Sequence, residues 1–144
     1  MTASHFQQLL QGHNASGLRD ALLRHHIASG RFVSLRGRRL LDGLLHALLP
    51  LHQQGIQLLT PGVVREHLNL HRAVDLAARP ELGDYAGLPL FDYLTSLEGF
   101  SPVAAENGEL PARVHCQHLR AVREVLRVIS HWTEPGTSGS DRLG

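Results

Sequence analysis

The sequence predicts an all-α domain, a compact bundle of about five to seven helices around a central leucine-rich helix and a long C-terminal helix. Apolar residues recur at steps of three and four along much of the chain, which is the periodicity of one helix face. The apolar content is dominated by leucine, with little isoleucine, phenylalanine or tyrosine, and this favours helix over sheet. With 144 residues, 42% of them hydrophobic, the chain can bury the core of one domain.

The central helix is expected over residues 39–52, RLLDGLLHALLPLH. Leu41, Leu44 and Leu48 repeat along one face, and further leucines widen that face until few polar positions are left. A helix this apolar must be covered on most sides, so other helices have to surround it. Pro50 is expected to end or kink the helix near Leu49, because proline lacks an amide N–H.

Two helices are expected before the central one. Residues 2–10 place Phe6 and two leucines on one side of a short helix. Ser16 is expected to cap a second helix that runs to about residue 29, where Gly30 stops it.

Two short helices are expected after the central one. Thr60 followed by Pro61 is a clear start signal, because the threonine side chain caps the helix and proline fits its first position. This helix is expected to end near His67, and another should follow over residues 71–79.

The last two helices are expected over residues 88–97 and 111–132. Between them, residues 99–110 form the longest irregular stretch, either a mobile binding loop or a connector. We therefore expect one domain over residues 1–133 and a disordered Gly/Ser-rich tail over residues 134–144. The predicted core cluster consists of Leu41, Leu44, Leu48, Leu94, Leu119, Leu126 and Trp132.

Charge is distributed unevenly along the chain. Residues 1–74 hold eight arginines and three acids, residues 75–109 hold one arginine and seven acids, and the whole chain has a net charge of +1. This division indicates either two binding faces or two solvated faces of one small domain. A separate row of Arg113, Arg120 and Arg127 in the last helix is expected to be solvated, with pairing to Glu124.

Four arginines stand immediately before or at the start of the central helix: Arg31, Arg36, Arg38 and Arg39. Clustered cations of this kind suit contact with a phosphate backbone or an acidic partner. The alternative interpretation is a solvated helix start, anchored by apolar neighbours.

The two short helices after Thr60 have the outline of a helix-turn-helix. The second helix offers Arg72, Asp75 and Arg79 as side chains that would read DNA, fewer than a recognition helix usually presents. A helix-turn-helix regulator is therefore the alternative function.

No motif for catalysis, a cofactor or a metal is found, and we expect none of these functions. His67 and His71 have the four-residue spacing of a two-histidine metal pair, but HExxH and a third ligand are absent. His115, Cys116 and His118 match no known ligand pattern. Cys116, the single cysteine, is expected to be a small core residue in a reducing compartment. With no membrane-spanning segment or signal peptide in the sequence, a cytoplasmic protein is expected.

Three runs of the chain share an order of features with a known family: LLDGLLHALLPLHQQGIQLLTPGVVREHLNLHRAVDLA, LPLFDYLTSLEGF and VHCQHLRAVREVLRVISHW. A leucine-rich helix with an internal proline leads to a helix start and an L-x-L turn. A helix ending YL-x-x-L-x-G-F and a long helix with an early histidine follow. The positions that carry these features are Pro50, Gly55, Ile56, Thr60, Leu68, Leu70, Tyr93, Leu94, Gly99, Phe100 and His118.

In this order, residues 16–132 resemble the all-α domain of the conjugative coupling ATPases, the TraD/TraG-like proteins of conjugation and type IV secretion. In that family the domain is inserted in a hexameric, membrane-associated DNA-pumping ATPase and faces the cytoplasm. The resemblance implies a non-catalytic module that recognises DNA, the relaxosome or secreted protein cargo, with the ATPase core as a further partner. This chain lacks a GxxxxGK[ST] phosphate loop, so no ATP hydrolysis is expected from it. It is either an excised domain or a freestanding relative.

Overall fold

The computed structural model describes residues 3–132, and over this range the chain is all-α, as predicted. Within it lie eight α-helices, one 3₁₀ helix and no strand. One short helix, α7, was not expected, because it lies inside the stretch 99–110. The predicted tail over residues 134–144 lies outside the described residues. The elements are α1 (Ala3–Gly12), α2 (Ala15–Ala28), α3 (Leu35–Gln53), α4 (Pro61–Glu66), α5 (Leu70–Ala77), η1 (Pro80–Leu82), α6 (Leu88–Thr95), α7 (Pro102–Glu106) and α8 (Ala112–Ser130).

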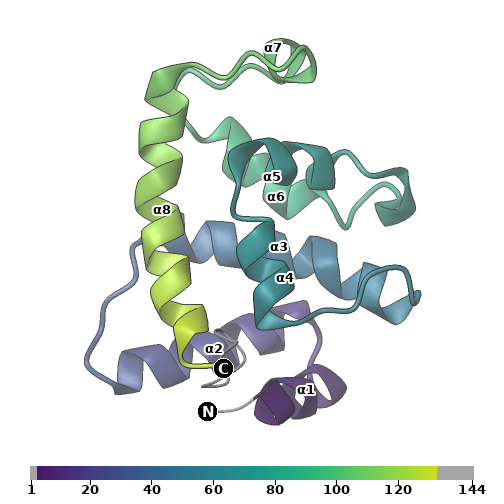
Figure 1. The fold of residues 1–144 in the computed structure, drawn as a ribbon, viewed down its shortest axis with the longest axis vertical. Coiled ribbons are helices and arrows are strands. Elements are labelled where there is room, and N and C mark those ends of the chain that lie inside the picture. The colour runs from purple at the N-terminus through teal and green to yellow at the C-terminus, as the bar shows by residue number, and fades with distance from the viewer. Residues whose placement is uncertain (1–2, 133–144) are drawn as a thin grey trace, which may run out of the picture.

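The helix α3 lies at the centre of the fold, as the sequence predicted. Its most extensive contacts are with α6, and it also packs against α8 and α2. Figure 1 shows α8 running along the long axis of the molecule past α3, with α1 and α2 toward one end and α7 at the other. Ten of the nineteen residues of α3 are buried, because neighbouring helices cover most of its circumference.

The helix α3 is longer than predicted at its start. It begins at Leu35, four residues earlier than expected, because the Ser34 hydroxyl oxygen accepts a hydrogen bond of 3.2 Å from the Gly37 amide. Pro50 does not end the helix. The chain stays helical to Gln53, and the Gln54 amide donates to the Pro50 carbonyl at 3.0 Å.

Local capping explains the ends of the other helices near α3. The predicted cap at Thr60 is confirmed, since its hydroxyl accepts a bond of 3.1 Å from the Val63 amide. The predicted cap at Ser16 is wrong. Asn14 caps α2 instead, with its side-chain oxygen 2.8 Å from the Gly17 amide.

The face that α8 turns toward the core differs from the predicted one. Leu119 is 48% exposed and Leu126 is only half-buried, so their assignment to the core is wrong for Leu119 and partly so for Leu126. The other five residues of the predicted cluster are buried. From Val114 to Val128, the residues of α8 that face the core are spaced alternately four and three apart, and they include an alanine and a histidine. The leucines of α8 lie on the neighbouring face. The face toward the core consists of Val114, His118, Ala121, Val125, Val128 and Ile129. Cys116 is exposed, so its assignment to the core is also wrong.

The backbones of α3 and α6 approach each other closely at Gly43. A Cβ atom added there would lie 2.7 Å from the Cα of Leu90 and 3.0 Å from its backbone nitrogen. Because backbone atoms cannot move aside as a side chain can, a larger residue at position 43 has to separate the two helices.

We therefore expect Gly43→Ala to lower the free energy of unfolding by about 1–3 kcal/mol through overpacking, although alanine is the better helix former. The matched control is Gly12→Ala, because Gly12 ends α1 with open space around its Cα. Urea unfolding of both variants measures the difference. Equal stability of the two variants would contradict the close approach.

No helix within residues 3–132 is both long enough and apolar enough to cross a lipid bilayer.

Candidate functional site

Three arginines border one hollow of about 450 Å³ where the start of α3 meets α6 and α8. Two of them, Arg36 and Arg39, come from α3, and Arg120 comes from the middle of α8. We call this site the arginine hollow; its lining residues are Ser34, Leu35, Arg36, Arg39, Ser96, Arg120 and Ala121. Its lining residues include three cations and no acid.

The arginine hollow depends on the joint between α3 and α8. The Ser34 amide donates to a carboxylate oxygen of Glu124 at 3.0 Å, and the Ser34 hydroxyl donates to the other oxygen. A Cβ atom at Gly37 would meet the same carboxylate, so a larger residue there would have to displace Glu124 from Ser34. Glu124 therefore fixes the first turn of α3 beside α8, and Arg120 lies one turn away on that helix.

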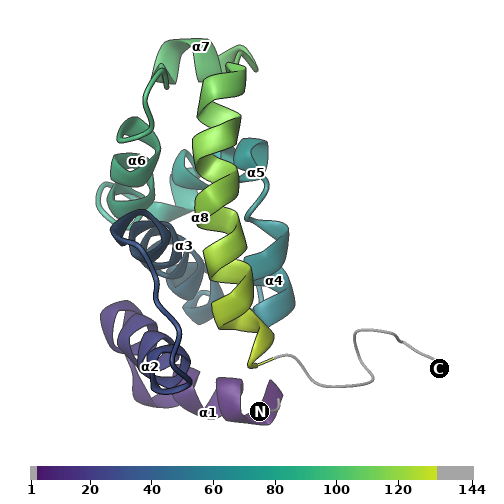
Figure 2. The same ribbon diagram turned by 90° about the vertical axis from the view of Figure 1, so that its left-hand side faces the viewer.

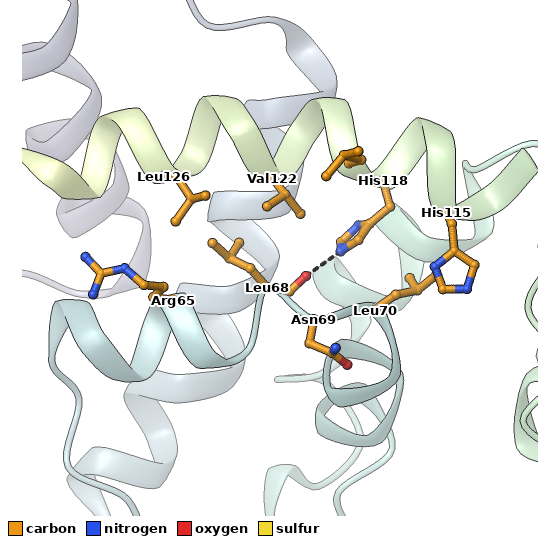
Figure 3. Close-up of a pocket in the computed structure, with 9 residues that line it drawn as sticks. Arg65, Leu68, Asn69, Leu70, His115, His118, Val122 and Leu126 are labelled. Atoms are coloured by element: carbon orange, nitrogen blue, oxygen red, sulfur yellow. Dashed lines mark hydrogen bonds between the residues drawn. The ribbon is translucent and has the colours of Figure 1, made fainter. Parts of the chain in front are cut away.

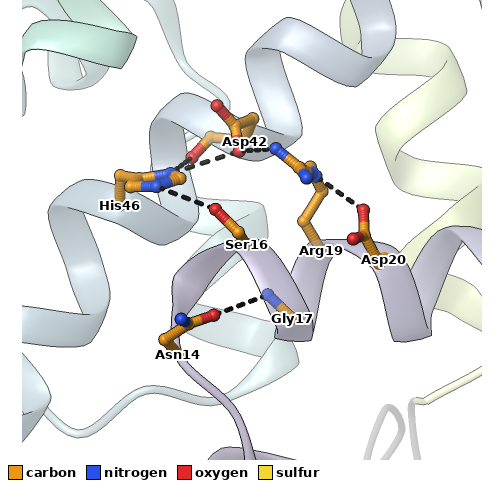
Figure 4. A network of polar contacts seen from close by, with 7 residues as sticks. All are labelled: Asn14, Ser16, Gly17, Arg19, Asp20, Asp42 and His46. Carbon is orange, nitrogen blue, oxygen red and sulfur yellow. Dashed lines mark hydrogen bonds and ion pairs between the residues drawn. The ribbon is translucent and has the colours of Figure 1, made fainter.

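The acid nearest to these arginines along α3 is held by other partners. Asp42 receives a 2.6 Å ion pair from Arg19 of α2 and lies 3.2 Å from the Nδ1 atom of His46 (Figure 4). Arg19 also pairs with Asp20 at 2.9 Å. Among residues 3–132, no carboxylate forms an ion pair with Arg36, Arg39 or Arg120.

Of the six arginines proposed from the sequence, only Arg36 and Arg39 line the arginine hollow. Arg31 is exposed in the loop before α3. Arg38 is exposed on the side of α3 that faces α2, and its Nε donates to the Val33 carbonyl at 3.2 Å. Arg120 had been assigned to a solvated row paired with Glu124. The sequence did not indicate that Arg120 borders the hollow, because tertiary packing decides which side of α8 faces α3.

The other two proposed arginines, Arg72 and Arg79, are paired with acids. Arg72 lies 3.7 Å from Glu66, and both side chains are largely exposed. Arg79 donates two hydrogen bonds to Glu81, at 3.2 and 3.1 Å, and the pKa of Arg79 is raised chiefly by this partner. The charge of each arginine is thus partly compensated before any ligand binds.

The helices α4 and α5 are joined by residues 67–69, as the helix-turn-helix outline predicted. One face of α5, with Leu70, Ala73 and Leu76, is buried, and the helix packs against α6 and α3. Its exposed residues are His71, Arg72 and Asp75, and the exposed Ala78 is its C-cap. This surface is mixed in charge.

The histidines singled out in the sequence have separate environments. His67 bonds through Nδ1 to the Val63 carbonyl at 2.8 Å, whereas the ring of His71 lies 5.9 Å from that of His115. Within the described range, no three His, Cys, Asp or Glu side chains are placed to hold a metal ion.

His118 belongs to a buried hydrogen-bond network. Its Nε2 lies 2.6 Å from the Leu68 carbonyl, which can only accept, so Nε2 carries the proton. Its Nδ1 then accepts from the Tyr93 hydroxyl at 2.8 Å. Burial lowers the pKa of His118 and raises the pKa of Tyr93, so both groups are neutral near pH 7.

A second hollow, of about 470 Å³, runs between α8 and the turn from α4 to α5 (Figure 3). Leu119, Val122 and Leu126 form its α8 side, and Leu68 and Leu70 lie opposite. This apolar hollow explains why Leu119 is exposed although it continues an apolar stripe. Sequence reasoning missed it, because the stripe was assigned to the core.

No protein-family model, curated protein or solved structure matches this chain.

Proposed function

We propose that the domain is a non-catalytic recognition module that contacts the phosphate backbone of nucleic acid through the arginine hollow. The observation that carries this proposal is the convergence of Arg36, Arg39 and Arg120, from two helices, on one hollow without an acidic lining residue. Guanidinium groups bind phosphate oxygens through paired hydrogen bonds, and they keep their charge at any physiological pH. Clustered arginines of this kind give binding that depends on phosphates rather than on base sequence.

The resemblance to coupling proteins suggests the setting of this module. It would act in the cytoplasm as the substrate-recognition domain for conjugation or type IV secretion, with DNA, relaxosome or protein cargo, and an ATPase core as partners. Three of the positions that carry the resemblance meet in one buried network, in which His118 bonds to both Leu68 and Tyr93.

The pairing of Arg72 in α5, and of Arg79 two residues after that helix, with acids favours this function over a helix-turn-helix regulator. A recognition helix needs side chains that are free to reach base edges. Arg72 and Arg79 instead pair with Glu66 and Glu81.

The test is fluorescence anisotropy with labelled duplex and single-stranded DNA at several salt concentrations. Arg36→Ala, Arg39→Ala and Arg120→Ala are combined in one variant. Loss of three phosphate contacts should weaken binding at low salt and flatten the slope of log affinity against log salt by about 2–3.

The matched control combines Arg72→Ala, Arg79→Ala and Arg113→Ala. It removes the same charge, but each arginine is paired with an acid, Arg113 with Glu98 at 3.3 Å. This control should retain most of the binding. If the control loses binding or sequence preference and the hollow variant does not, the helix-turn-helix function is the better one. If neither DNA binds at low salt, both functions fail.

A further inference from the structure

The loop between α2 and α3 presents an exposed aromatic side chain, Phe32, two residues before Ser34, the first residue that lines the arginine hollow. Phe32 is 77% exposed, and Leu35, which lines the hollow, is 64% exposed. Figure 2 shows this loop on the side of the molecule that faces the viewer, leading into the start of α3 between α6 and α8. Exposed apolar groups that adjoin one another commonly mark a binding surface.

Phe32 is held in place by its neighbours. Val33 is only 2% exposed, so it anchors the loop in the core, and Ser34 is bonded to Glu124. In an extended chain, successive side chains point to opposite sides, so burial of Val33 turns Phe32 outward. The ring is therefore presented to solvent from a segment that is anchored on its C-terminal side, at Val33 and Ser34.

The combination of an outward aromatic ring with unpaired arginines has a specific chemical use. Proteins that bind single strands contact the phosphates with cations and stack bases on aromatic side chains. In a duplex the bases are already stacked and paired, and their faces are not available to a surface ring. Arg31 precedes Phe32, and Arg36, which lines the hollow, follows it by four residues, so cationic groups lie on both sides of the ring along the chain.

We infer that the nucleic acid this domain binds is single-stranded, with a phosphate in the arginine hollow and a base stacked on Phe32. The inference rests on the proposed function, because stacking at Phe32 requires that the arginines hold the strand. It adds a specificity: Phe32 selects single strands, and the arginines supply affinity that both forms of nucleic acid share.

The experiment measures anisotropy of labelled dT12, rU12, a duplex and an abasic strand with the same number of phosphates. The wild-type chain should bind dT12 or rU12 more tightly than the duplex and the abasic strand. Phe32→Ala should weaken binding to the preferred single strand about 5- to 150-fold, the range found for loss of one stacked base. Its binding to the abasic strand and its salt slope should not change, because no charge is removed. Whichever of dT12 and rU12 binds more tightly identifies the preferred nucleic acid as DNA or RNA.

Two substitutions and a control make the result specific. Phe32→Tyr should retain binding, whereas Phe32→Leu, which keeps apolar area without an aromatic face, should not. Tyr85→Ala is the matched control, because Tyr85 is 79% exposed and belongs to the loop before α6, away from the hollow. It should bind like the wild-type chain.

The outcomes separate this inference from the proposed function. If the arginine variant loses binding but Phe32→Ala binds dT12 and rU12 as the wild-type chain does, stacking is wrong and the proposed function stands. Equal affinity for the abasic strand, or full binding by Phe32→Leu, would also overturn stacking. If no nucleic acid binds, the proposed function itself fails, and the exposed pair of Phe32 and Leu35 is then a contact for a protein partner.

Discussion

Leu44→Ala is expected to lower the free energy of unfolding by about 2–5 kcal/mol. Leu44 is 0% exposed on α3, the helix that contacts α2, α6 and α8. Truncation removes its transfer free energy and leaves a cavity at the centre of the fold. Because helices on several sides are fixed by their own contacts, the cavity can close only in part, which favours the upper end of the range. Urea unfolding, followed by helix circular dichroism, measures the change.

The matched control for Leu44→Ala is Leu119→Ala. The sequence assigned both leucines to the core, but Leu119 is 48% exposed at the apolar hollow. We expect Leu119→Ala to change stability by about 1 kcal/mol or less, in the range of surface substitutions. A loss below 1 kcal/mol for Leu44→Ala would show that α3 is not the centre of the core.

His118→Leu is expected to cost about 2–5 kcal/mol, since it leaves two buried polar groups without a partner at about 1–3 kcal/mol each. These groups are the Tyr93 hydroxyl and the Leu68 carbonyl, which now bond to the two ring nitrogens. Adding Tyr93→Phe removes one of the orphaned groups. The double variant should therefore be more stable than the sum of the two single losses implies. Strict additivity in urea unfolding would contradict the network.

The same histidine makes stability depend on pH, and His118→Gln tests this effect. Burial lowers the pKa of His118 in the folded protein, so the unfolded chain binds more protons below its pKa of about 6.5. The stability that the protein gains from keeping His118 neutral is therefore complete above pH 6.5. It is lost as the pH falls below 6.5, by at most about 1.4 kcal/mol per pH unit. Glutamine offers a donor and an acceptor but does not titrate, so its variant should lose less stability between pH 7.5 and 5.5. An unchanged pH dependence would show that folding does not lower the pKa of His118. Burial also lowers the pKa of His26 and of His131, so some dependence should remain.

The features that the sequence predicted correctly are those with local causes. Thr60 caps the helix that begins beside it, and the leucine periodicity of α3 is visible within a few turns. Asn14 was missed because Ser16 is an equally good cap by residue type, and only the path of the chain after α1 decides between them.

The features that were missed depend on distant partners. The start of α3 was placed four residues late, although Ser34 caps it locally; the acid that holds Ser34 in that position, Glu124, is 90 residues away in the sequence. On α8, leucines gave the most apolar stripe, but the inward face is the one on which Ala121 allows close approach and His118 finds partners. The spacing from Val114 to Val128 in steps of four and three was the available signal. The same error concealed the position of Arg120. Because the wrong face of α8 was assigned to the core, Arg120 was not expected to lie beside the start of α3.

The bond between Ser34 and Glu124 also sets the order in which the arginine hollow can assemble during synthesis. Arg36 and Arg39 leave the ribosome early, yet the residues that complete the site, Arg120 and Glu124, lie in α8, the last described helix. A nascent chain in which α8 has not yet been synthesised therefore contains Arg36 and Arg39 but has not formed the arginine hollow. The same dependence holds in the finished protein whenever α8 detaches. Local opening of this one helix would expose the Ser34 amide to hydrogen exchange and dismantle the hollow, while Asp42 and Arg19 still hold α2 against α3.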